Sequence, residues 1–113
     1  MDQLKQYQRA IRKVLTEYAT FLESSPDRNY KVALLFDDEH GQYAVRRIGD
    51  WQKKRFRYTD LHISITNGKV WIEEDMTEDG IANALVEAGI PQNAIVLGFQ
   101  PPYVREQMAF AVA

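Results

Sequence analysis

The sequence predicts a single α+β domain over residues 1–113, with an N-terminal helix followed by an antiparallel four-stranded meander. A helix, a short strand and a short C-terminal helix should then pack on the sheet. Three observations support this fold class. Apolar residues near the N-terminus repeat at helical spacing, and an Asn-Gly turn separates two β-rich runs. The 113 residues, 45% of them hydrophobic, suffice for one core but not for two domains.

The segment before Ser24 predicts an amphipathic helix. Asp2 can cap its N-terminus, because a short acidic side chain accepts hydrogen bonds from the first free backbone amides. Residues 24–27, with the sequence Ser-Ser-Pro-Asp, should end it. The apolar residues recur at spacings of three and four and therefore share one face: Leu4, Tyr7, Ile11, Val14, Leu15, Tyr18 and Leu22.

The first two strands should form a hairpin. Residues 30–36 are apolar at both odd and even positions, which predicts a strand at the centre of the sheet with both faces buried. Residues 37–41, Asp-Asp-Glu-His-Gly, are turn formers, and residues 42–48 should return as the second strand.

The strongest local signal is Asn67-Gly68, which predicts a two-residue type I′ turn between the third and fourth strands. One face of this pair should be apolar and face the core, and the other should be polar with one aromatic residue. The turn predicts these cross-strand pairs: Thr66 with Lys69, Ile65 with Val70, Ile63 with Ile72 and, on the polar face, Ser64 with Trp71 and His62 with Glu73.

The C-terminal half predicts three further elements. A second helix should start near Thr77, a capping residue, and stop at Gly89 ahead of Pro91. Residues 95–99 predict one more strand, and residues 101–108 a short helical turn.

Composition excludes several classes of protein. With no cysteine, the chain has no disulfide, thiolate nucleophile or cysteine metal site. Its apolar runs are too short to span a membrane, and its first residues lack the apolar stretch of a signal peptide, so we expect a cytoplasmic protein. Neither a nucleophile elbow nor a glycine-rich phosphate loop occurs. We therefore expect no enzymatic activity and no cofactor.

Two places could still carry chemistry. Residues 37–40 place three acids and an imidazole together, as a metal site would, but a hairpin loop uses the same residue types and adjacent ligands cannot all converge. We expect no metal there. His62 and Glu73 could handle protons in a small hydrolase. A surface pair contributing roughly 0.2–1 kcal/mol is the favoured interpretation.

Charge is distributed unevenly along the chain. Residues 42–59 hold six basic side chains and one acid, Asp50, and Trp51, Phe56 and Tyr58 are interleaved with the basic residues. Residues 70–90 hold six acids and neither lysine nor arginine. Two solvated sheet faces would explain both stretches. A basic cluster with aromatics is also typical of a surface that binds nucleic acid or an acidic protein.

We predict a partner-binding site from the basic cluster and from the polar face of the third and fourth strands. A large aromatic side chain opposite the core suits an interface, although a second helix could simply cover Trp71. The predicted site comprises Arg46, Arg47, Trp51, Lys53, Lys54, Arg55, Arg57, His62, Trp71 and Glu73.

The second half of the chain resembles a known family. The motifs are Asn67-Gly68-Lys69-Val70-Trp71-Ile72, Thr77-Glu78-Asp79-Gly80-Ile81-Ala82, Gly89-Ile90-Pro91, Ile95-Val96-Leu97-Gly98-Phe99, Pro102 and the ending Phe110-Ala111-Val112-Ala113. In the first half, Tyr7, the run Tyr43-Ala44-Val45 and Leu61-His62-Ile63 fit as well. Together they resemble the XisI family, the fdxN-element excision controlling factors of filamentous cyanobacteria.

The resemblance implies a non-enzymatic accessory factor. Members of the family act with a companion called XisH, and a site-specific recombinase requires both to excise a DNA element during heterocyst development. The leading hypothesis is therefore a regulatory protein that binds a XisH-type partner. The alternative is direct DNA binding through the basic residues of segment 46–58, and we also expect self-association.

Overall fold

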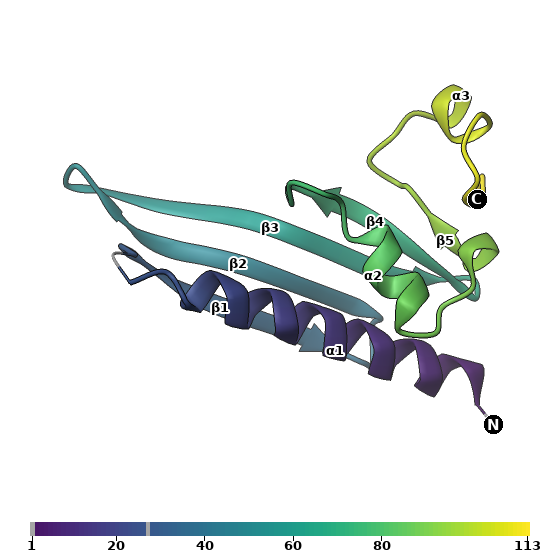
Figure 1. Cartoon of the computed structure of the whole chain (residues 1–113), viewed down its shortest axis with the longest axis horizontal. Helices are drawn as coiled ribbons and strands as arrows, with labels where there is room; N and C mark the ends of the chain where they lie inside the picture. Colours follow the sequence, from purple (N-terminus) through teal and green to yellow (C-terminus); the bar gives the residue numbers. More distant parts are fainter. Residues whose placement is uncertain (1, 27) are drawn as a thin grey trace.

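The computed structural model describes residues 2–26 and 28–113, so Asp27, the last residue of the predicted helix stop, lies outside it. Helices α1 (Gln3–Glu23) and α2 (Ala82–Glu87) pack on one face of a five-stranded sheet (Figure 1). We call this side the helix face and the other side the open face. The strands lie in the order β1 (Tyr30–Asp37), β2 (Gln42–Trp51), β3 (Lys54–Thr66), β4 (Lys69–Asp75) and β5 (Ile95–Val96).

Helix α1 confirms the amphipathic prediction. The Asp2 carboxylate accepts a hydrogen bond of 3.0 Å from the Leu4 amide, as an N-cap does. Leu4 itself is 48% exposed, so the buried stripe begins one turn later than predicted. That stripe packs against the sheet and comprises Tyr7, Ala10, Ile11, Val14, Leu15, Ala19 and Leu22. Among the described residues, no helix is both long enough and apolar enough to cross a membrane.

The four-stranded antiparallel meander is confirmed, but the place of its first strand is not. β1 lies at the edge of the sheet, with β2 as its neighbour on one side. The prediction of a central strand is therefore wrong, because apolar residues on both faces do not reveal whether both strand edges are paired. The Asn67-Gly68 turn is confirmed, with φ angles of 52° and 76°, and it sets the predicted pairing of Ile63 with Ile72.

A β-bulge changes one predicted pair. The register of β3 and β4 shifts beside His62, which stands opposite Glu74 instead of Glu73. Glu73 accepts a 2.6 Å hydrogen bond from the Ser64 hydroxyl, and the His62 Nε2 lies 2.8 Å from the Gln42 side-chain oxygen. The predicted pairing of His62 with Glu73 is therefore wrong, because an extra residue in β4 moves the glutamate out of register.

The C-terminal elements are shorter than predicted. The second helix starts at Ala82 instead of near Thr77, because the Asp75 carboxylate accepts hydrogen bonds from the amides of Thr77 and Ile81 and holds a turn between them. β5 pairs in parallel with β4 and so adds a fifth strand to the sheet beside the antiparallel meander. The predicted strand over 95–99 ends at residue 96, and the last helix, α3 (Pro102–Arg105), forms within the predicted helical turn.

Candidate functional site: a basic hairpin arm

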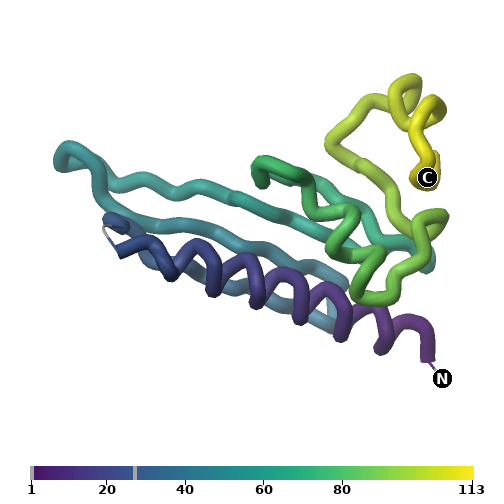
Figure 2. Tube along the Cα trace, in the orientation of Figure 1, coloured from purple at the N-terminus to yellow at the C-terminus, as the bar shows by residue number. Residues whose placement is uncertain are grey.

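The outer halves of β2 and β3 form a hairpin that reaches past the C-terminal end of α1 (Figure 1). We call residues 46–59 the basic arm. Figure 2 shows its tip at the end of the molecule opposite the N-terminal end of α1 and the chain's C-terminus. The basic stretch of the sequence therefore lies on a projecting element.

The turn at the tip of the arm uses residues that seldom make such turns. Gln52 and Lys53 have φ angles of 51° and 66°, the left-handed region that both central residues of a type I′ turn require. Glycine and asparagine adopt this region at lower cost, and neither is present. Because the turn lacks a glycine or asparagine signal, the sequence did not reveal it, and β2 runs to Trp51 instead of ending at the predicted residue 48.

One cation of the arm is bound internally. Arg47 points to the helix face and donates two hydrogen bonds, of 2.9 and 2.8 Å, to the carboxylate of Asp60, which is 1% exposed. The guanidinium also lies over the rings of Tyr30 and Tyr58, at 5.3 and 4.8 Å from their centroids. The hydrogen bonds to Asp60 raise the pKa of Arg47 further above its ordinary value. Arg47 is therefore held within the fold, where it stabilises the arm.

A second β-bulge makes this pair possible. The register of β2 and β3 shifts between Val45 and Arg46, so that Asp60 is the extra residue on β3. Its carboxylate can then turn under the neighbouring strand and meet Arg47. Asp60 was not predicted as a structural residue. The one signal in the sequence is its position, since an acidic residue inside a β-rich run has no obvious acceptor role unless a cation from another strand pairs with it.

The remaining cations of the arm are more open. Arg55 lies 3.3 Å from the Asp50 carboxylate, with both side chains more than half exposed. Arg46 donates a hydrogen bond of 3.2 Å to the Thr59 hydroxyl. Over the described residues 2–26 and 28–113, no carboxylate pairs with the following arm residues, which we call the free arm cations: Arg46, Lys53, Lys54 and Arg57.

An exposed aromatic side chain accompanies these cations. Trp51 is 63% exposed beside the turn, whereas Tyr58 is covered on one side by the Arg47 guanidinium. A large flat side chain among free cations is a frequent anchor of protein interfaces.

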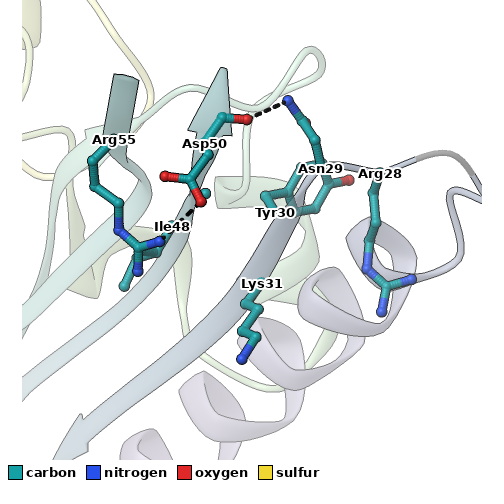
Figure 3. A pocket seen from close by; sticks show the side chains of 8 residues that line it. Arg28, Asn29, Tyr30, Lys31, Ile48, Asp50 and Arg55 are labelled. Atoms are coloured by element: carbon teal, nitrogen blue, oxygen red, sulfur yellow. Dashed lines mark hydrogen bonds and ion pairs between the residues drawn. The ribbon is translucent and has the colours of Figure 1, made fainter. Parts of the chain in front are cut away.

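A shallow pocket of about 300 Å³ lies between the start of β1 and the outer part of the arm in β2 and β3. Figure 3 shows Arg55 directed at the Asp50 carboxylate and the Asn29 amide donating to the Asp50 carbonyl, while Arg28 and Lys31 point away from this pair. Arg28 and Lys31 add positive charge that the sequence reasoning missed, since only the pairing of β1 with β2 brings them to the arm.

Close packing fixes the chain at this pocket. A Cβ on Gly49 would lie 2.3 Å from the backbone oxygen of Asn29, so only glycine lets the segment before β1 cross so near to β2. The arm is thus packed tightly against the start of β1 as far as Gly49, and only the residues beyond it project.

The other predicted site residues lie away from the arm. Trp71 is half-buried on the open face of β4, where the Arg105 guanidinium lies 5.5 Å from its ring centroid. A Cβ on Gly98 would lie 3.1 Å from the Trp71 ring, so the C-terminal segment packs directly on it. His62 and Glu73 have the separate partners given above. The structure therefore separates the predicted site into the arm and a second, partly covered group.

The loop between β1 and β2 directs its acids apart. Asp38 accepts hydrogen bonds from Arg12 at 2.8 Å and from the Tyr43 hydroxyl at 2.7 Å, and these bonds lower the pKa of its carboxyl. Asp37 instead binds the His40 ring, 2.8 Å from Nδ1. Among the residues that the structure describes, no cluster of three or more His, Cys, Asp or Glu side chains could hold a metal ion.

Fold and arm together define a small α+β protein whose most distinctive surface is a projecting basic hairpin. The family model described as XisI protein matches residues 1–112, and the chain belongs to the XisI family. The resemblance stated from the sequence is thereby confirmed. A comparison with curated proteins gives no match.

Two solved structures are similar over nearly their whole length. One is the fdxN element excision controlling factor XisI from Anabaena variabilis ATCC 29413, with 38% identity, a TM-score of 0.86, and coverage of 99% of this chain and 100% of that one. The other is a XisI-like protein from the same organism, with 34% identity, a TM-score of 0.87, and coverage of 97% and 99%. The chain therefore shares its fold with both proteins.

Proposed function

We propose that this chain is a non-enzymatic regulatory factor in the excision of a DNA element, and that it acts by binding a XisH-type companion protein through the basic arm. Membership of the XisI family supports the regulatory role, since a similar structure is that of an excision controlling factor. The observation that carries the binding site is the arm itself, where free cations and an exposed Trp51 extend beyond the helices.

The chemistry of the arm indicates an acidic partner surface. Cations without acidic neighbours attract such a surface over about one Debye length, roughly 8 Å at physiological ionic strength. Trp51 then contributes apolar area at the centre of the contact, where desolvation is most favourable. Lys54 stands opposite Trp51 and Lys53 lies in the turn at the tip, whereas Arg46 and Arg57 lie on the open face, so an acidic groove fits better than a flat surface.

A matched pair of variants tests the arm. The arm variant carries Lys53→Glu, Lys54→Glu and Arg57→Glu, and the control carries Lys5→Glu, Arg9→Glu and Lys13→Glu on the exposed side of α1, which changes the net charge equally. Titration calorimetry with the companion protein should give about 30- to 150-fold weaker binding for the arm variant, since each lost pair contributes about 0.7–1 kcal/mol. The control should bind nearly as the unmodified chain does.

Two results would reject the proposal. One is the absence of any complex between the unmodified chain and the companion at micromolar concentrations. The other is an equal loss of binding in both variants, because that would indicate a general dependence on net charge and no role for the arm.

Direct DNA binding is the second candidate function, favoured by the same free arm cations. If Arg46, Lys53, Lys54 and Arg57 all contacted phosphates, the logarithm of the binding constant would fall with the logarithm of the salt concentration with a slope of about −3 to −4. A gel-shift titration over a range of salt concentrations measures this slope. An absent or salt-independent shift would reject DNA contact and leave the protein partner.

A further inference from the structure

The two edges of the sheet are protected differently. β5 is two residues long, and Ala111 covers it, donating a 2.8 Å hydrogen bond to the Ile95 carbonyl. β1 is eight residues long, contains no proline, and pairs with β2 without a register shift. Among the described residues no strand pairs with its outer side. An edge of this kind can accept another strand.

The side chains of β1 are unusual for an edge. Leu34 on the helix face is 37% exposed and Leu35 on the open face is 52% exposed. Soluble proteins normally blunt such edges with charge, proline or a bulge. This is the same pattern that predicted a central strand from the sequence, and pairing along the free edge would make the strand central. The exposure of Leu34 also indicates that α1, although packed over β1, leaves its rim open.

The hydrogen-bonding pattern of β2 shows which residues of β1 direct their backbone N–H and C=O groups to the free edge. The Gly41 carbonyl accepts a hydrogen bond from the Ile65 amide, so the odd-numbered residues at this end of β2 direct their backbone groups to β3. Gln42 and Ala44 therefore bind β1 through their partners Asp37 and Leu35. It follows that Leu34 and Phe36 direct their N–H and C=O groups outwards.

We propose that the free edge of β1 pairs with the same edge of a second copy of this chain, antiparallel, with Leu34 on the two-fold axis. In this register Lys31 of each copy stands opposite Asp37 of the other, so both ends of the pair are matched in charge. Val32 stands opposite Phe36 on the helix face, and Ala33 opposite Leu35 on the open face. Shifting the register by two residues moves Lys31 away from Asp37 and leaves one end of a strand unpaired.

The dimer would have a defined shape. Its two sheets join into one, with both α1 helices on the same side, because opposite residues of an antiparallel pair point to the same face. β1 begins beside the arm, where Tyr30 pairs with Gly49, and ends at the far end of β2, where Asp37 pairs with Gln42. Antiparallel pairing therefore places the two basic arms at opposite ends of the joined sheet.

A charge swap tests the register. Lys31→Asp places two carboxylates opposite each other at both ends of the pair, and Asp37→Lys places two ammonium groups there. Each variant alone should dimerise about 10- to 100-fold more weakly than the unmodified chain in sedimentation equilibrium. An equimolar mixture of the two should regain the affinity, because in the mixed pair both ends oppose unlike charges. Lys5→Asp on α1 is the control and should change nothing.

The outcomes separate this dimer from other assemblies. A chain that stays monomeric up to about 200 μM, well above the micromolar range of weak contacts, would overturn the proposal. So would single variants that dimerise normally, or a mixture no tighter than its components. If Asp37→Lys does not fold, Leu34→Lys replaces it, since it sets two ammonium groups face to face on the axis and should abolish the dimer. Asp37→Lys and Leu34→Lys lie outside the arm and its pocket, so companion binding is measured separately on these two variants, whereas Lys31→Asp also removes a positive charge beside the arm.

Discussion

The two ends of the β2–β3 hairpin differ in what lies on the helix face. At the end near the Asn67-Gly68 turn, which we call the closed end, Tyr43, Ile63 and Ile72 are fully buried beneath the two helices. At the arm end the same face carries Arg47 and Asp60, and α1 stops short of the tip. One end is held by apolar packing, and the other by a single buried ion pair between tyrosine rings.

The difference assigns separate tasks to the two ends. Burial of apolar area at the closed end supplies the stability of the fold. The arm contributes little apolar burial, and its free cations pair with no carboxylate among the described residues. Mutation of the free arm cations should therefore cost little free energy of unfolding. A loss of partner binding in such a variant would then reflect the arm itself and not unfolding of the protein.

The largest expected effect contrasts apolar residues of the two ends. Ile63→Ala should lower the free energy of unfolding by about 2–5 kcal/mol, because it leaves a cavity at a site with 0% exposure. Ile48→Ala, at a half-buried position on the open face of the arm, should cost about 1 kcal/mol or less. Urea denaturation of both variants measures the difference, and equal losses would remove the distinction between the ends.

The buried pair of the arm should come next. Arg47→Met leaves the Asp60 carboxylate buried without its cation and should lower the free energy of unfolding by about 2–3 kcal/mol. This loss is small for a buried pair, because the Arg47 side chain retains 30% exposure. The double variant with Asp60→Asn should recover part of this loss. A double-mutant cycle in urea measures the coupling, and additive losses would contradict a direct pair.

A smaller effect is expected at the tip. Gln52→Asn should raise the free energy of unfolding by about 0.5 kcal/mol, because asparagine adopts the required positive φ more readily. Lys53 stays in place, so companion binding should not weaken. Thermal unfolding followed by circular dichroism measures the shift, and a destabilised variant would show that the turn is not of this type.

The smallest effect concerns pH at the closed end. Hydrogen bonds from Arg12 and then Tyr43 lower the pKa of Asp38 below its ordinary 3.8, so the folded state favours the ionised form. Its stabilising contribution is present above that ordinary value and is lost as the pH falls through the lower folded one. Arg12→Met should raise the Asp38 pKa, as measured by NMR titration of the carboxyl carbon. An unchanged pKa would show that Arg12 does not contact Asp38 in solution.

Features set by neighbouring residues could be predicted from the sequence. The Asn67-Gly68 turn and the amphipathic α1 depend on local φ preference and on helical spacing, and both are found in the structure. The two bulges could not be predicted, because an extra residue in one strand is defined only by the strand beside it. For this reason Asp60 was missed and His62 was assigned the wrong partner.

The predicted site shows the same limit. A run of basic residues identified the arm, since charge along the chain needs no knowledge of the fold. The sequence could not separate Arg47, bound by Asp60, from Arg57, which has no acidic partner among the described residues, because the two lie on opposite faces of one strand pair. Nor could it place Lys31 near the arm, which depends on the pairing of β1 with β2.

The most direct test of the proposed function is a map of the contact surface in solution. Amide chemical shifts of the isotope-labelled chain, recorded during titration with the companion protein, should change most at residues 51–57, at the tip of the arm. The amides of Ile63 and Ile72 at the closed end should stay unchanged. Shifts concentrated on α2 or the C-terminal segment, with the arm unaffected, would contradict the arm as the partner-binding site.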